Sequence, residues 1–128
     1  MPGPLFNVYD ANCPSRTALN RIGDRWTALI VGVLSQRAHR FGELRRRIDG
    51  ISQKMLTQTL RSLERDGLVS RHAYATVPVT VEYALTPLGE TLAHVLAGVR
   101  DWAEAHAGDL LAARERFDGH AQRSASAT

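Results

Sequence analysis

The hydrophobic pattern of this chain changes its period at Gly67, and this change constrains the fold more than any other feature. Before Gly67, apolar residues recur at helical spacing, which predicts a helix with one buried face formed by Leu56, Leu60 and Leu63. After it come two β-rich runs, residues 68–75 and 79–85, separated by a turn at residues 76–78. The sequence therefore predicts a helix followed at once by a β-hairpin.

A second amphipathic helix is predicted immediately before this one. It begins at Arg40 and places apolar residues on one face, namely Phe41, Leu44 and Ile48. Gly50 supplies the positive φ that ends a helix, and Ser52 is the best N-cap candidate for the helix that follows. Two helices joined by so short a turn predict a helix-turn-helix.

Two further helices are predicted upstream. Residues 1–12 contain prolines and a glycine without periodicity, so we expect an extended arm. A helix then begins at Cys13 and Pro14 and ends at Gly23, with an apolar face of Ala18, Leu19 and Ile22. Asp24 caps the next helix, whose stripe we expect in the core: Trp26, Leu29, Ile30 and Val33.

The C-terminal part of the chain predicts one long helix, with Thr86 as its cap and Pro87 in its first position. Its apolar residues repeat in a heptad pattern, which favours packing of one helix on another: Leu88, Leu92, Val95, Val99, Trp102 and His106. We expect the seam from Leu88 to Trp102 to form a homodimer interface. Beyond Gly108 the pattern weakens, which predicts a short helix and then a disordered tail.

The order of elements predicts a mainly α fold with a small β-hairpin wing (α+β). This is a winged helix-turn-helix with additional N- and C-terminal dimerisation helices. Residues 1–12 are the arm, residues 13–107 the domain with its dimerisation helices, and residues 108–128 the short helix and tail. A chain of 128 residues accommodates one hydrophobic core of this kind.

The positive charge of the chain is concentrated in its middle. Residues 36–72 carry a net charge of +5, against +1 for residues 1–35 and −3 for residues 73–128. Such a segment fits a surface that faces a polyanion, and it equally fits a solvated surface. The longest apolar run spans residues 28–34, far short of the roughly 20 residues that cross a bilayer. Without such a span or a secretory signal, we expect a cytoplasmic protein with no membrane partner.

The helix after the turn carries a polar face, opposite its leucines, that suits a DNA major groove. Arg and Lys donate to guanine, Gln pairs with adenine, and a threonine methyl contacts the methyl of thymine. We expect this face to contact bases through Ser52, Gln53, Lys54, Thr57, Gln58 and Arg61. We expect contacts with backbone phosphates from Arg65, Arg71 and Arg46.

Cys13 is a candidate redox sensor. It lies just before a helix N-terminus and near Arg16, and both features favour the thiolate and raise its reactivity toward oxidants. The alternative is a half-buried small residue without chemistry. Because Cys13 is the single cysteine, an intrachain disulfide and a cysteine-rich zinc site are excluded.

Other reactive residue types form no recognisable site. His94 and His106 are separated by about 120° around a helix, so they do not share a face as paired metal ligands would. No Ser/His/Asp set, phosphate-binding loop or carboxylate pair stands out. The sequence therefore predicts no enzyme, no metal and no cofactor.

With these residues assembled, the chain resembles the HxlR-type family of bacterial winged-helix transcription regulators from Cys13 to about Trp102. The most specific block is Ile51–Thr57, which resembles the start of the family's recognition helix. The other matching blocks are Cys13-Pro14, Ile22-Gly23-Asp24-Arg25-Trp26, Arg40-Phe41-Gly42-Glu43-Leu44-Arg45, Leu63-Glu64-Arg65-Asp66-Gly67-Leu68-Val69, and Val81-Glu82-Tyr83 followed by Leu85-Thr86-Pro87-Leu88-Gly89.

The resemblance implies a homodimer that binds pseudo-palindromic operator DNA through paired recognition helices, with terminal helices at the dimer interface. Some members of the family sense oxidants or electrophiles through a cysteine near the N-terminus, and Cys13 matches it in position. The wing departs from the family pattern. Family wings often carry a basic residue before Val-Glu-Tyr, where this chain has Pro78-Val79-Thr80, so the resemblance does not imply a phosphate contact at the wing tip.

Three hypotheses remain beside a plain DNA-binding regulator. In the first, oxidation or electrophile modification of Cys13 controls DNA binding. In the second, a small molecule binds a dimer pocket lined by Trp26 and Trp102, and Cys13 takes no part. In the third, the winged helix contacts proteins and not DNA. The expected partners are therefore double-stranded operator DNA, a second copy of the chain, and a small-molecule or oxidant effector.

Overall fold

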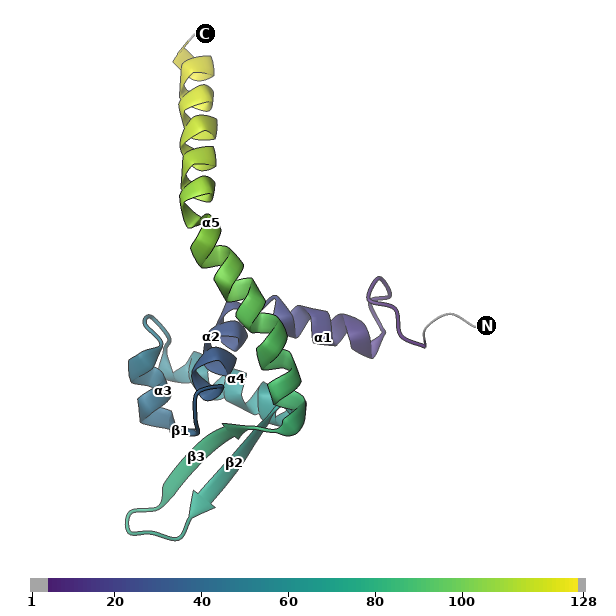
Figure 1. Ribbon diagram of the computed structural model, residues 1–128, viewed down its shortest axis with the longest axis vertical. Helices are drawn as coiled ribbons and strands as arrows, with labels where there is room; N and C mark the ends of the chain where they lie inside the picture. Colours follow the sequence, from purple (N-terminus) through teal and green to yellow (C-terminus); the bar gives the residue numbers. More distant parts are fainter. Residues whose placement is uncertain (1–4, 127–128) are drawn as a thin grey trace. The chain divides into compact units, whose positions relative to one another are not determined.

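The computed structural model describes residues 5–126, and its elements follow the predicted order with one added strand (Figure 1). The fold is mostly helical, with a three-stranded antiparallel sheet of order β1-β3-β2. The elements are α1 (Pro14–Ile22), α2 (Arg25–Leu34), β1 (His39–Arg40), α3 (Phe41–Arg47), α4 (Gln53–Arg65), β2 (Val69–Tyr74), β3 (Thr80–Leu85) and α5 (Pro87–Ser126). The predicted mainly α fold with a hairpin wing is confirmed.

The helix-turn-helix forms where the sequence predicts it. The Oε1 of Glu43 accepts a hydrogen bond from the backbone N–H of Arg40 at 2.9 Å and closes the first turn of α3. Gly50 has φ of 82°, so the chain reverses there at a backbone conformation that favours glycine. The Oγ of Ser52 then accepts from the N–H of Met55 at 3.0 Å, which confirms Ser52 as the N-cap of α4.

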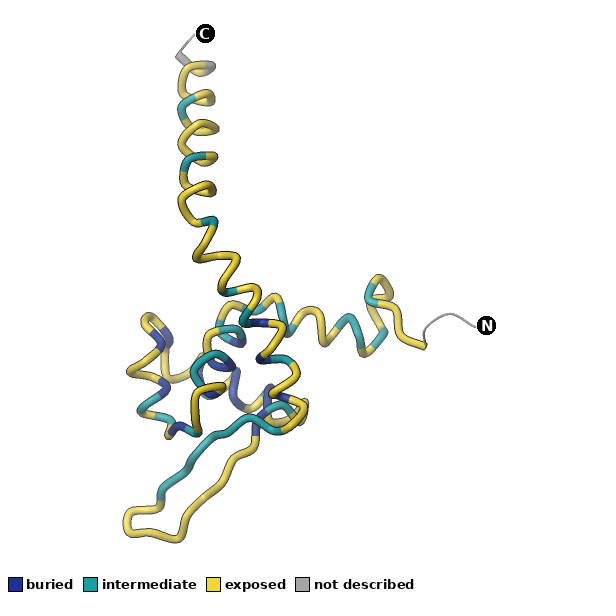
Figure 2. The backbone as a smooth tube through the Cα atoms, viewed as in Figure 1, coloured by how far each residue is buried: buried dark blue, intermediate teal, exposed yellow. Residues whose placement is uncertain are grey.

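The core lies between the helix-turn-helix, α2 and the base of the hairpin, where the buried residues of Figure 2 gather. The three leucines of α4 are all buried, and α2 and α3 contribute Ile30 and Leu44. The remaining members of the buried apolar cluster are Val31, Leu34, Ile48, Ile51, Val69, Ala93 and Leu96.

The predicted core face of the first two helices is partly wrong. Leu29 is 41% exposed, and α2 instead buries the neighbouring Val31 and Leu34. Leu19 is 47% exposed and Ala18 is also exposed, and none of the residues of α1 is buried. The buried residues of α2, Thr27, Ile30, Val31 and Leu34, form one face that is shifted by one residue from the predicted stripe, which leaves Leu29 outside.

Strand β1 is absent from the sequence-based prediction because two residues are too short to show a period. It pairs with β3, with His39 opposite Tyr83 and Arg40 opposite Glu82. The predicted hairpin forms between β2 and β3 (Figure 1). In its register, Arg71 of β2 lies opposite Tyr83. The added strand anchors the base of the wing to the segment that leads into α3.

The chain divides into two compact units after Leu96, and α5 crosses the division. In the first unit, α5 buries Ala93 and Leu96. In the second unit, no described side chain is buried. Beyond Gly108 the sequence predicts a short helix and a disordered tail, whereas α5 is one helix that continues to Ser126. A single glycine costs a helix only about 1 kcal/mol, which flanking residues with good helix propensity offset.

Residues 1–4 of the predicted arm and residues 127–128 of the predicted tail lie outside the described residues.

The start of α5 packs closely on the end of α4. Thr86 caps α5 as predicted, since its Oγ1 accepts from the N–H of Gly89 at 3.0 Å. The N–H of Thr86 donates to the carbonyl of Leu68 at 3.1 Å. A Cβ at Gly89 would overlap that carbonyl oxygen, so only glycine fits there.

Replacing Gly89 by alanine is expected to lower the free energy of unfolding by about 2 kcal/mol or more, because the new methyl group overlaps the Leu68 carbonyl. Gly108→Ala is the control, since a Cβ there meets nothing within 4 Å. That variant is expected to gain up to about 1 kcal/mol from helix propensity. Urea unfolding measures both, and an equal response of the two variants would contradict the packing argument.

Candidate nucleic-acid interface

The polar face of α4 is exposed because its opposite face is buried in the core. Four of the side chains predicted to contact bases are exposed and make no hydrogen bond or ion pair among the described residues: Gln53, Lys54, Gln58 and Arg61. Thr57 is half-buried, and its Oγ1 donates to the carbonyl of Gln53 at 2.8 Å. Ser52 is exposed and its hydroxyl is engaged as the N-cap. The donors and acceptors of the four unengaged side chains are therefore available to a ligand.

The structure brings Arg61 of α4 and Arg71 of β2 to the same groove. The groove has a volume of about 470 Å³ and lies between α4 and the hairpin, with Thr57, Glu64 and Tyr83 also in its walls. Two guanidinium groups against one carboxylate leave the groove positive, as a phosphate site requires. The sequence did not predict Tyr83 or Glu64 in this groove. Tyr83 lies beside Arg71 only because β2 pairs with β3.

The two other cations predicted to contact phosphates lie elsewhere. Arg65 is exposed at the end of α4 and forms no ion pair among the described residues. Arg46 lines a different polar cavity of about 590 Å³, together with Arg40, Glu43 and Glu82. With Arg37 also in its walls, this cavity combines three guanidinium groups with two carboxylates, and Arg37 is paired with Glu43.

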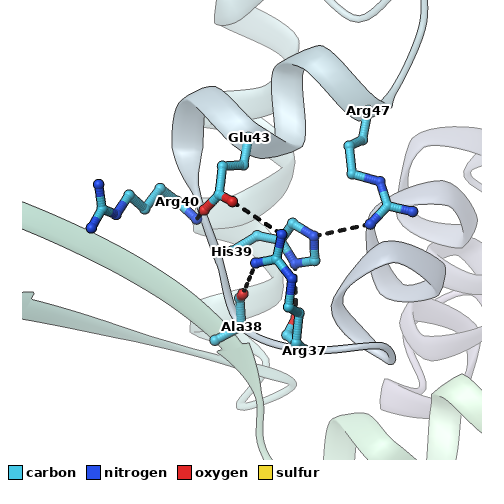
Figure 3. Close-up of polar contacts among 6 residues, drawn as sticks. All are labelled: Arg37, Ala38, His39, Arg40, Glu43 and Arg47. Atoms are coloured by element: carbon cyan, nitrogen blue, oxygen red, sulfur yellow. Dashed lines mark hydrogen bonds and ion pairs between the residues drawn. The ribbon is translucent and has the colours of Figure 1, made fainter.

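A polar cluster that the sequence did not predict joins the end of α2 to α3 (Figure 3). His39 is fully buried, and its Nδ1 lies 2.8 Å from the carbonyl of Arg37. The Nη1 of Arg47 lies 3.3 Å from Nε2 of His39, and Arg37 pairs with Glu43 at 3.1 Å. The N–H of Arg40 and the Arg37 guanidinium both bond to Glu43 and hold the pKa of its carboxyl below the usual range.

The tip of the hairpin offers apolar side chains and no cation. Val77 and Val79 are exposed, and no basic residue occurs from residue 73 to residue 81. Below the tip, the hydroxyl of Tyr74 donates to Oε2 of Glu82 at 3.1 Å, which raises the pKa of the phenol. The departure from the basic family pattern thus extends over the whole tip.

Cys13 is the half-buried N-cap residue of α1, and its sulfur accepts two hydrogen bonds. The Oγ of Ser15 and the N–H of Asn7 each donate to Sγ at 3.2 Å. The hydrogen bond from the Ser15 side chain lowers the pKa of the thiol most, followed by the bond from Asn7, while the nearby Asp10 acts in the opposite direction. These bonds favour the thiolate.

The expected role of Arg16 beside Cys13 is wrong. Its Nε donates to the carbonyl of Val8 at 2.5 Å, and its Nη2 donates to the carbonyl of Tyr9 at 3.2 Å. The guanidinium therefore holds the segment before α1 in place, and hydrogen bonds take over the stabilisation that the sequence assigned to its charge. Whether Arg16 acts on Cys13 or on the backbone depends on the local path of the segment before α1, which sequence spacing does not predict.

The predicted dimer seam of α5 is largely exposed in the single chain. Leu92 packs partly against the core. The other four residues are exposed apolar side chains: Leu88, Val95, Val99 and Trp102. Trp102 also stacks on His106, with ring centroids 4.8 Å apart. Such faces are available to a partner.

Residues 5–126 contain no cluster of three or more His, Cys, Asp or Glu side chains with the geometry to hold a metal ion. Within the same residues, no helix combines the length and the apolar character needed to span a membrane.

Comparison with known proteins identifies the family to which this fold belongs. The HxlR-like helix-turn-helix family model matches residues 21–110. The uncharacterised HTH-type transcriptional regulator YtfH of Escherichia coli K12 is 46% identical over 109 residues, which cover 85% of this chain and 86% of that protein. The structure of the putative transcriptional regulator ytfH from Salmonella typhimurium has a TM-score of 0.80 at 44% identity, covering 86% of this chain and 98% of that one.

A structure of the redox regulator HypR in its oxidised form also matches, with a TM-score of 0.68 and 40% identity over 73% of this chain and 96% of that one. The fold and these matches define a transcriptional regulator with a helix-turn-helix domain. Its relatives are regulators and not enzymes. The chain belongs to the HxlR family.

Replacing Ser15 by alanine is expected to raise the pKa of Cys13, because the strongest hydrogen bond to its sulfur is lost. At a pH below that pKa the thiolate fraction falls, so alkylation by iodoacetamide slows, while the rates converge at high pH. The pH profile of the alkylation rate measures this shift. Ser35→Ala, whose hydroxyl bonds only to the carbonyl of Gly32, is the control. An unchanged profile in Ser15→Ala would contradict the assignment.

Proposed function

We propose that this chain is a homodimeric transcriptional regulator that binds a pseudo-palindromic operator sequence-specifically in the cytoplasm. The observation that carries the proposal is the exposed face of α4, where Gln53, Lys54, Gln58 and Arg61 keep their donors and acceptors free. Such side chains on the second helix of a helix-turn-helix suit the edges of bases in a major groove. Membership of a family of helix-turn-helix regulators supports this assignment.

Within this proposal the predicted residues take two roles. Ser52, Thr57 and the four unengaged side chains of α4 face bases, with Arg61 as the candidate for a bidentate contact with guanine. Arg65 and Arg71 contact backbone phosphates, Arg71 from the groove that it shares with Arg61. Arg46 is a further phosphate contact from the side of α3.

The homodimer places two copies of α4 on one face of the DNA. The exposed apolar seam from Leu88 to Trp102 forms its interface, together with α1, and these helices belong to the functional domain at residues 13–107. Two-fold symmetry then requires half-sites about one helical turn apart, roughly 34–36 Å between centres. Residues 108–128 extend this domain.

Arg61→Ala is expected to weaken operator binding by about 1–3 kcal/mol, and to weaken binding to scrambled DNA less, because a guanine contact is lost only on the operator. Fluorescence anisotropy with the protein's own upstream DNA, over a salt series, measures both affinities. Arg114→Ala, exposed on α5, is the matched control and should change neither.

An equal loss on both sequences would assign Arg61 to a phosphate instead. Weak binding that does not depend on salt would overturn the DNA-binding proposal in favour of a winged helix that contacts proteins, since neutralising several phosphates makes affinity fall steeply with salt.

We further propose that oxidation or electrophile modification of Cys13 controls DNA binding. The hydrogen bonds from Ser15 and Asn7 favour its thiolate, which is the reactive form. The similarity to a structure of a redox regulator supports the same assignment. With one cysteine in the chain, a disulfide has to form with another molecule.

Cys13→Ser is expected to leave operator affinity in reductant unchanged and to abolish any change caused by diamide or hydrogen peroxide. The measurement is the operator Kd of both proteins with and without oxidant, followed by reversal with dithiothreitol. Release from the operator that persists in Cys13→Ser would assign sensing to another group. No response in the native chain would leave a regulator in which Cys13 is structural.

A further inference from the structure

Glu64 is the one acidic residue in the sequence of α4, and it lines the groove that the proposed function assigns to a DNA phosphate. The cations in the walls of this groove are Arg61 of α4 and Arg71 of β2. Glu64 is exposed, and its carboxylate makes no hydrogen bond or ion pair among the described residues. A negative charge without a partner therefore lies where a polyanion is expected to bind.

The fold gains little from this carboxylate. Glu64 lies in the last turn of α4, where the helix dipole disfavours a negative charge. Arg61 precedes it by three residues, and an acid that follows a base along a helix gains less from such a pair than an acid that precedes it. By contrast, the carboxylates of Glu43 and Glu82 both accept hydrogen bonds from other residues. Glu64 thus does not stabilise the fold as these two carboxylates do.

The backbone of α4 nevertheless keeps Glu64 at the groove. Leu60 and Leu63 are buried, so α4 cannot rotate about its axis without exposing them to water. The carbonyl of Glu64 accepts a hydrogen bond from the N–H of Gly67 at 3.0 Å, and Gly67 has φ of 74°. The helix therefore ends directly after Glu64, with the carboxylate on the same side as Arg61.

We propose that Glu64 is a specificity-determining residue that lowers the affinity for DNA without the operator sequence. This inference rests on the proposed function, in which Arg61 contacts a guanine and Arg71 a phosphate. Every DNA sequence carries the same phosphates. A carboxylate in the groove competes with these phosphates for the guanidinium groups on any DNA.

Operator and non-operator DNA differ in what Arg61 contacts. On the operator, Arg61 is engaged by guanine, which has no net charge, so Glu64 opposes only the phosphate at Arg71. On other sequences Arg61 finds no guanine at that position, and both guanidinium groups contact phosphates. Glu64 then weakens two phosphate contacts instead of one. Its charge therefore lowers the affinity for non-operator DNA more, and the ratio of the two affinities rises.

The test is fluorescence anisotropy of the full chain, in reductant, with two DNA duplexes. One is a duplex that the native chain selects from a random library, and the other is a scrambled duplex of the same composition. Glu64→Gln removes the charge and keeps the size of the side chain. We expect this variant to bind the selected duplex about twofold and the scrambled duplex about fivefold more tightly at low salt. The difference should shrink as salt rises, because exposed charges are screened.

Two further comparisons separate this role from a general effect of charge. Glu115→Gln, exposed on α5, changes the net charge equally and should keep the native ratio of affinities. In an Arg61→Ala background, Glu64→Gln should tighten binding to both duplexes by the same factor, about twofold, because Arg71 is then the only guanidinium in the groove. Urea unfolding of Glu64→Gln should give a free energy of unfolding equal to or above that of the native chain.

An unchanged ratio of affinities in Glu64→Gln would overturn this inference and leave the proposed function standing. The same holds for a change of ratio that persists without Arg61, and for a loss of unfolding free energy, which would assign Glu64 to the fold. A native chain that selects no sequence from the library would overturn the proposed function, and this inference with it.

Discussion

The packing of the leucine face of α4 is the interaction on which the rest of this structure depends. Leu56, Leu60 and Leu63 are buried against side chains from α2, α3, β2 and α5, and each contributes about 1.5–3 kcal/mol relative to exposure. Rotating the helix by even one residue would expose these leucines. The buried face therefore determines which side chains point outward, and the available hydrogen-bonding groups from Gln53 to Arg61 are a consequence of core packing.

The end of α4 is held by a junction in which backbone groups approach closely. The carbonyl of Gly67 accepts from Oγ1 of Thr86, the carbonyl of Leu68 accepts from its N–H, and the absence of a side chain at Gly89 lets α5 lie against Leu68. Asp66, one residue before this junction, pairs with α1. Residues 66–69 thus connect the C-terminus of α4 with α1, the base of the wing and the start of α5. We expect a change in any of these residues to affect the elements that it joins.

Hydrophobic period and cap chemistry predicted most of the fold, because both are local. Ser52, Gly50 and Thr86 do what their residue types favour in isolation. The sequence failed where tertiary packing decides: strand β1 exists only because β3 lies beside it, and Arg16 turns to backbone carbonyls that no spacing rule indicates. For the candidate site, the polar face of α4 could be predicted from the sequence of that helix alone. The groove that Arg61 and Arg71 share could not be predicted, because it depends on where the hairpin lies.

The net charge of residues 36–72 overstates the number of cations available to DNA. Arg37 pairs with Glu43, the guanidinium of Arg47 contacts buried His39, and Arg46 shares its cavity with two carboxylates. Some of the basic residues in this segment therefore stabilise the fold, since their guanidinium groups hold the link between α2 and α3 in place. Cations without an ion pair lie on α4 and the hairpin, namely Lys54, Arg61, Arg65 and Arg71, and also around the start of α3, at Arg40 and Arg45. Salt dependence of the proposed DNA binding should follow the contacts that such side chains make and not the formal charge, because counterion release counts phosphates that are actually neutralised.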